Sequence, residues 1–121
     1  MKVVINSSYG GFSLSHEAIM AYAKRKGTVV YPELSSRSRA ATLYWTVPPE
    51  QQTESGNGQT LYDREIPRDD SDLIAVIEEL GEAADGRHAR LTVVEIPDDV
   101  QWQIEEYDGY EHVAEKHRTW S

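Results

Sequence analysis

The sequence contains no cysteine among its 121 residues. This absence excludes disulfide bonds, zinc sites with thiolate ligands and cysteine nucleophiles. Long apolar runs are also missing, so the sequence predicts no membrane-spanning helix. No lipidation motif is present, and Met1 and Lys2 lead directly into a short apolar run, so we expect neither a lipid anchor nor a signal peptide. These features favour a cytoplasmic protein.

Basic residues are scarce relative to acidic ones. Twelve lysines and arginines stand against 21 aspartates and glutamates, which gives a formal net charge of −9. Long nucleic acids are therefore disfavoured as partners, because their affinity comes mostly from phosphate neutralisation. An anionic membrane surface is disfavoured for the same reason. A small anionic ligand in a local basic pocket is compatible with this charge.

Catalytic motifs are missing as well. No HExxH sequence and no GxSxG sequence occur, and no two histidines have the spacing of a helical metal-binding pair. The acidic residues before the second predicted helix are explained most simply as helix caps. We therefore expect no metal and no cofactor, and a non-enzymatic protein is favoured over an enzyme. The histidines considered are His16, His88, His112 and His117.

The first stretch of the chain has the pattern strand, Gly-Gly loop, helix. Residues 2–5 are mainly β-branched and predict a buried strand. Ser15 is a good N-cap and Gly27 a good C-terminal stop, so we predict a helix over residues 15–26. Such an arrangement can hold an anion at the helix N-terminus, although two glycines can equally form a tight turn. The loop residues predicted to contact a ligand are Ser7, Ser8, Tyr9, Gly10, Gly11 and Phe12.

The middle of the chain alternates short β-type runs with one further helix. Pro32 is predicted to end the second strand, since the residue before a proline leaves the helical region and the proline lacks a donor. An acidic start and an apolar stripe at helical spacing predict a helix over residues 70–84, stopped by Gly86. The predicted strands cover residues 28–31, 41–47 and 91–96, with a short extended piece at residues 61–66 that pairs with the strand before it.

The C-terminal part predicts a β-hairpin. Val100, Trp102 and Ile104 alternate with polar residues, which is typical of a half-buried strand. Asp108-Gly109 favours a type I′ turn, and the return strand is predicted over residues 111–118. The fold class is therefore α+β, as one domain over residues 1–121. We expect a mixed or antiparallel sheet of five to six strands with two helices, and the hairpin edge offers a contact for homo-oligomers.

Two segments combine positive charge with other ligand-binding groups. In the tail, Arg118 can hold a phosphate with two hydrogen bonds, Lys116 and His117 add charge, and Trp120 can stack on a base. The alternative is a polar edge strand whose terminal aromatic residue seals the core. Arg37 and Arg39 form a second candidate phosphate clamp, with a solvated loop as the alternative.

Three segments carry a resemblance: VVINSSYGGFSLS, IPRDDSDLIAVIEELGEAADG and IEEYDGYEHVAEKHRTW. They look like a family of small uncharacterised bacteriophage proteins, and the similarity spans nearly the whole chain apart from residues 37–59. Phage proteins of this size include counter-defence proteins, some of which sequester cyclic nucleotides or signals derived from ADP-ribose. The resemblance implies action in the cytoplasm of the infected host.

The leading hypothesis is a non-enzymatic binding protein that sequesters a small phosphorylated immune signal of nucleotide type. An acidic inhibitor of a basic host protein is the main alternative, and a nucleotide-processing enzyme that uses the same pocket is the third. The inhibitor would present the side chains of Asp69, Asp70, Asp72, Glu78, Glu79 and Glu82.

Overall fold

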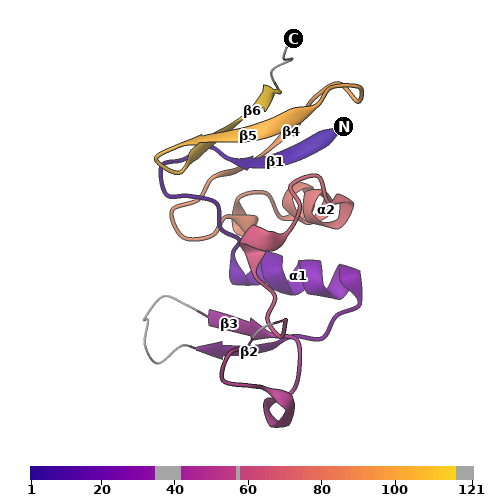
Figure 1. Ribbon diagram of the computed structural model, residues 1–121, viewed down its shortest axis with the longest axis vertical. Helices are drawn as coiled ribbons and strands as arrows, with labels where there is room; N and C mark the ends of the chain where they lie inside the picture. The colour runs from indigo at the N-terminus through magenta and orange to yellow at the C-terminus, as the bar shows by residue number, and fades with distance from the viewer. Residues whose placement is uncertain (35–41, 57, 117–121) are drawn as a thin grey trace, which may run out of the picture.

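The computed structural model describes residues 1–34, 42–56 and 58–116. These residues form two α-helices and six strands, so the predicted α+β class is confirmed (Figure 1). Among the described residues, no helix has both the length and the apolar character that crossing a bilayer requires. The elements are β1 (Lys2–Asn6), α1 (His16–Lys26), β2 (Tyr31–Leu34), β3 (Thr42–Trp45), α2 (Ser71–Leu80), β4 (Leu91–Glu95), β5 (Trp102–Tyr107) and β6 (Tyr110–Glu115).

The strands form three two-stranded antiparallel sheets instead of one continuous sheet. The pairs are β1 with β4, β2 with β3, and β5 with β6. Figure 1 shows them as successive layers: the β5–β6 hairpin lies on one face of β1–β4, the two helices lie on the other, and the β2–β3 ribbon lies beyond α1. The start of β1 and the end of β6 lie at the same end of the molecule (Figure 1).

The β1–β4 pair is the centre of the core. Val4 lies opposite Val93 on the face toward the helices, and Val4 is fully buried in the main apolar cluster. Val3 and Ile5 alternate with Val4 along β1 and are also buried, and β1 packs against β6 of the hairpin. A strand buried on both faces is continuously apolar and does not alternate, which explains why the predicted strand at residues 2–5 is confirmed.

The first helix is confirmed with its caps. The Ser15 side chain accepts a hydrogen bond from the Ala18 N–H at 3.1 Å, and Gly27 adopts φ 71° just after the last turn. The Thr28 N–H then donates to the Ala23 carbonyl at 2.9 Å, as in a Schellman motif. Because the helix end uses Thr28, the strand predicted to begin there starts only at Tyr31.

The prediction that Pro32 ends the second strand is wrong. Pro32 lies inside β2 and pairs with Tyr44 of β3. This is tolerated because, within the described ranges, β3 is the only strand paired with β2, and a proline at the open edge of a strand breaks no ladder bond. The extended piece predicted over residues 61–66 is confirmed only at its start, where Thr60 bridges to Trp45 and the Leu61 N–H donates to the Tyr44 carbonyl at 2.7 Å. Residues 63–65 form a 3₁₀ helix instead.

The second helix ends earlier than predicted. Asp70 is its N-cap and accepts hydrogen bonds from the Asp72 N–H at 2.8 Å and the Leu73 N–H at 3.1 Å. The α-helix stops at Leu80 instead of Ala84, because Gly81 takes φ 57° and ψ −131°, a conformation outside the helical region. The chain continues as a short 3₁₀ helix, η3 (Gly81–Ala84). The predicted α-helix over residues 70–84 is therefore an α-helix followed by a 3₁₀ helix, and its end was placed too far along the chain.

The hairpin turn is confirmed. Asp108 has φ 50° and Gly109 has φ 88° between the paired residues Tyr107 and Tyr110. Two positive φ values are what a type I′ turn requires. The return strand was predicted to run to Arg118, but β6 ends at Glu115, and Arg118 lies outside the described residues.

Candidate anion-binding pocket

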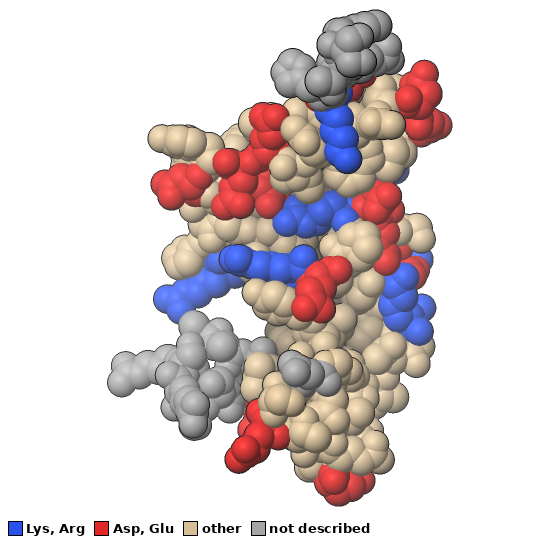
Figure 2. All heavy atoms as spheres, in the orientation of Figure 1, with Lys and Arg blue, Asp and Glu red and all other residues tan. Residues whose placement is uncertain are grey.

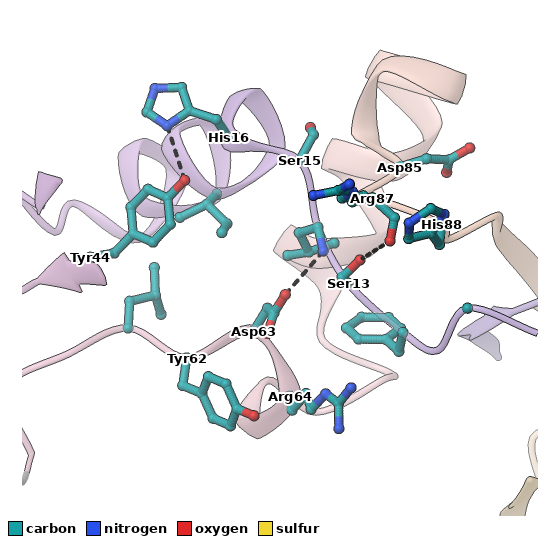
Figure 3. Close-up of a pocket in the computed structure, with 16 residues that line it drawn as sticks. Ser13, Ser15, His16, Tyr44, Tyr62, Asp63, Arg64, Asp85, Arg87 and His88 are labelled. Atoms are coloured by element: carbon teal, nitrogen blue, oxygen red, sulfur yellow. Dashed lines mark hydrogen bonds between the residues drawn. The ribbon is translucent and has the colours of Figure 1, made fainter. Parts of the chain in front are cut away.

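A cavity of about 600 Å³ opens beside the start of α1. Three segments that are distant in the sequence form its walls: residues 10–16, residues 61–64 and residues 85–88. The second segment includes the start of the 3₁₀ helix η2 (Asp63–Glu65). Figure 3 shows side chains of all three segments around the cavity. The volume lies within the range of about 300–1,000 Å³ that small-molecule sites occupy.

Two arginines border this cavity, Arg64 from η2 and Arg87 from the segment after η3. Both side chains are exposed, and neither makes a hydrogen bond or an ion pair with any residue that the structure describes. Basic side chains gather across the middle of the face shown in Figure 2, with acidic ones beside, above and below them. Two unpaired guanidinium groups therefore border one cavity of an acidic protein.

Two carboxylates also line the cavity, but each is engaged with the backbone. Asp63 Oδ2 accepts the Leu14 N–H at 3.0 Å, and Asp85 Oδ1 accepts the Leu91 N–H at 2.9 Å. Figure 3 shows Asp63 turned toward the chain before α1 and Asp85 on the other side of that chain. These acids hold the walls in place, and the arginines are left to face a ligand.

Aromatic and titratable rings complete the lining. The Tyr62 side chain is 51% exposed and offers a free ring face. His16 Nδ1 lies 3.0 Å from the Tyr44 hydroxyl, so these two rings are tied together across the cavity wall. His88 adopts φ 65°, which turns the chain sharply beside Arg87. Planar rings next to guanidinium groups are suited to a ligand that has both a flat base and an anionic group.

The N-terminus of α1 lies in the same wall. Ser15 caps the helix and donates its own hydroxyl hydrogen to the Ala83 carbonyl at 2.6 Å. Ser13 Oγ donates to the Arg87 carbonyl at 3.4 Å. The partial positive charge of the helix start adds to that of the arginines, whereas neither serine hydroxyl is paired with a base that would activate it.

The predicted Gly-Gly loop contributes only in part. Gly10 and Phe12 line the cavity, but Ser7 Oγ lies 2.6 Å from Thr92 Oγ1, and Ser8 Oγ donates to the His88 carbonyl at 2.5 Å. A Cβ on Gly10 would lie 2.0 Å from that same carbonyl oxygen. The glycine therefore permits a close backbone contact within the protein itself.

The rest of this loop lies away from the cavity. Gly11 has φ 86°, and Tyr9 is exposed, with its ring centroid 5.3 Å from that of Tyr110. The loop thus packs against the hairpin turn on one side and the His88 segment on the other.

The predicted cationic tail is described only at its start. Lys116 is exposed, and its N–H donates to the Gln101 carbonyl at 2.9 Å, at the end of the hairpin opposite its turn. It does not line the cavity. The other predicted ligand residues of the two cationic segments, Arg37, Arg39, His117, Arg118 and Trp120, lie outside the described residues.

Sequence reasoning missed the residues that surround the cavity. Arg64 and Arg87 stand in short connections without periodicity, and no motif marks either of them. His16 and His88 were considered only as metal ligands. The arginines and histidines come together around the cavity only because α1, η2 and η3 pack against one another, and no local sequence pattern predicts that packing.

Comparisons of the chain with protein-family models, with curated proteins and with solved structures find no match.

Proposed function

We propose that this protein binds a small phosphorylated ligand of nucleotide type in the cavity beside α1 and does not chemically alter it. The observation that carries this proposal is the pair Arg64 and Arg87. Both border one cavity, and neither guanidinium group has a hydrogen-bond or ion-pair partner among the described residues. In a chain of net charge −9, two unpaired cations at one place favour an anionic ligand.

Phosphate is the anion that these groups fit best. A guanidinium group binds phosphate with two parallel hydrogen bonds, and two arginines suit a dianionic or bridging phosphate. The exposed Tyr62 ring supplies a stacking surface for a base. The overall negative charge opposes long-range attraction of an anion, so affinity rests on these few close contacts.

The arrangement of polar groups supports binding without turnover. The Ser15 hydroxyl is directed to the Ala83 carbonyl and the Ser13 hydroxyl to the Arg87 carbonyl. His16 is hydrogen-bonded to Tyr44. A nucleophile in contact with its base is the minimum for covalent catalysis, and the described lining offers no such pair. In the phage setting that the resemblance implies, tight binding would remove a host immune signal from solution.

The acidic surface that the inhibitor alternative requires is partly neutralised within the protein. Lys26 Nζ lies 3.0 Å from Asp70 Oδ2 and 2.9 Å from Asp72 Oδ2, and Lys2 Nζ lies 3.0 Å from Glu78 Oε2. Half of the side chains assigned to that surface are therefore paired within the protein. The proposal for a ligand-binding cavity does not depend on them.

The test is calorimetry of the purified protein with AMP, ADP-ribose, a cyclic dinucleotide and inorganic phosphate. We expect Arg64→Ala and Arg87→Ala each to weaken nucleotide binding by about 10- to 100-fold, since a hydrogen bond to a charged group contributes roughly 1.5–3 kcal/mol. Arg25→Ala is the matched control, because it makes the same change of charge at the far end of α1.

Mass spectrometry of the recovered ligand separates binding from catalysis. An unchanged ligand mass supports a binding protein, and a changed mass would support the enzyme alternative. Affinities equal to wild type in both arginine variants, with unchanged melting temperatures, would remove the cavity from consideration.

A further inference from the structure

Three exposed tyrosines meet at the turn of the hairpin. Tyr107 is 77% exposed, Tyr9 is 67% exposed and Tyr110 is 40% exposed. Tyr107 and Tyr110 face each other as the pair that closes the turn, and the Tyr9 and Tyr110 ring centroids lie 5.3 Å apart. We call these three residues the tyrosine patch. Large exposed aromatic side chains gathered at one place are typical of protein–protein contact sites.

The tyrosine patch is held in a fixed arrangement. A Cβ on Gly109 would lie 2.7 Å from the Tyr9 carbonyl oxygen, so the turn sits directly on the loop that carries Tyr9. The Asn6 side-chain amide donates to the Gly109 carbonyl and to the Ser8 carbonyl, each at 2.8 Å. Asn6 is fully buried. Little ordering is therefore needed on binding, which favours affinity.

Acidic residues are concentrated in the hairpin that carries two members of the tyrosine patch. Glu106 and Asp108 flank Tyr107 in the sequence, both are exposed, and neither carboxylate makes a hydrogen bond or ion pair with a described residue. The sequence from residue 98 to residue 115 contains seven acidic residues and no lysine or arginine. Figure 2 shows acidic side chains gathered over the hairpin end of the molecule.

We infer that the tyrosine patch docks an arginine-bearing basic segment of another protein. Guanidinium groups stack on tyrosine rings through cation–π attraction, and the carboxylates of the hairpin attract the positive charge of such a segment. A second copy of this chain fits poorly, because two acidic rims of like sign would face each other. This surface shares no residue with the lining of the cavity beside α1, so the inference is independent of the proposed ligand.

The test uses a fluorescent peptide of alternating arginine and glycine as the probe, titrated with full-length protein at 0.15 M ionic strength, where general attraction is screened beyond about 8 Å. Tyr107→Thr removes the ring and keeps a residue that favours strands. We expect it to weaken binding at least about fivefold. Tyr31→Thr is the matched control, since Tyr31 is an exposed strand tyrosine in β2, at the other end of the molecule.

Both tyrosine substitutions leave the net charge unchanged, so they separate a specific site from general attraction to an acidic protein. Equal binding by the wild type and Tyr107→Thr would overturn the inference. A second variant, Glu106→Gln with Asp108→Asn, should weaken binding and lower its salt dependence, whereas Glu79→Gln should not. Sedimentation velocity completes the design: a wild-type dimer that Tyr107→Thr dissociates would assign the patch to a second copy and overturn the basic partner.

Discussion

Arg68 and Glu111 form a buried, two-pronged ion pair beneath the hairpin. Arg68 Nη1 lies 2.6 Å from Glu111 Oε1, and Nη2 lies 2.9 Å from Oε2. The Glu111 carboxylate also accepts the Asn6 N–H at 2.8 Å, and the Arg68 guanidinium lies 3.6 Å from the centre of the Phe12 ring. One pair thus joins β6, β1 and the segment before α2, and fixes the hairpin on the core.

Removing one member of this pair should destabilise the fold strongly. We expect Glu111→Ala to lower the free energy of unfolding by about 3–5 kcal/mol, because it leaves a largely buried guanidinium without its counter-charge. It also leaves the Asn6 N–H without an acceptor. Urea denaturation measured by circular dichroism gives the value. Glu105→Ala is the control, since the pair of Glu105 with His112 is exposed and should contribute less than about 1 kcal/mol.

The double variant Arg68→Met with Glu111→Leu tests whether the unpaired charge causes the loss of stability in Glu111→Ala. Replacing both partners by apolar side chains removes the unpaired charge, so we expect it to recover a large part of the stability that Glu111→Ala loses. A double variant as unstable as Glu111→Ala would show that lost packing, and not the unpaired charge, dominates.

Gly109, in the hairpin turn, should tolerate a side chain poorly. It has φ 88°, and an added Cβ would meet the Gly11 N and the Tyr9 carbonyl oxygen at 2.7 Å. Gly109→Ala tests this contact. Gly27→Ala is the control, because Gly27 has φ 71° but open space around it. The left-handed conformation alone costs about 1–2 kcal/mol, so thermal denaturation should show a clearly larger loss for Gly109→Ala.

Lys26 links the two helices through a pH-dependent cluster. Its hydrogen bond lowers the pKa of Asp72. Burial by itself raises the pKa of Asp70, but hydrogen bonds from Lys26 and from the Leu73 and Asp72 backbone outweigh it, so that pKa is lowered too. The pKa of Lys26 is raised by hydrogen bonds to Asp72 and Asp70.

These directions set the pH range of the stabilisation. Depressed carboxyl pKa values stabilise the fold above the unfolded value of about 3.9 and lose that effect as pH falls through the folded values. The raised pKa of Lys26 stabilises the fold below about 10.4 and loses its effect at higher pH. Lys26→Met should therefore lower the urea midpoint at pH 7 and converge with the wild type near pH 2. Lys24→Met, in the same helical turn, should leave the urea midpoint unchanged at both pH values. A difference between Lys26→Met and the wild type that stays constant across pH would show that the stabilisation by Lys26 is not electrostatic.

Arg118→Ala and Arg64→Ala together compare the two places where a phosphate contact was inferred. The sequence pointed to Arg118, and the structure brings Arg64 to the border of the cavity. If the cavity holds the phosphate, Arg64→Ala should reduce nucleotide affinity about 10- to 100-fold, while Arg118→Ala binds like the wild type. Calorimetry on the two variants, each checked for an unchanged melting temperature, gives the answer. The reverse order of affinities would move the site to the tail.

The sequence alone determined the elements whose signals are local. Ser15 and Gly27 mark the ends of α1 because caps satisfy the free N–H and C=O groups of a helix whatever surrounds it. Asp108-Gly109 set the hairpin turn because few residue pairs tolerate two positive φ values. The apolar run of β1 predicted a buried strand, because a strand that is covered on both faces is apolar at successive positions.

Tertiary structure decided what depends on distant neighbours. Pro32 is accepted inside β2 because, in the part of the chain that the structure describes, only β3 pairs with that strand. Gly10 and Gly109 are required by the backbones that approach them, which belong to residues far away in the chain. Arg64 and Arg87 share a cavity only because η2 and the segment after η3 both pack against the start of α1. Local patterns specify how a segment folds, whereas the packing of segments specifies which side chains share a site, and that packing is set by the burial of the whole core.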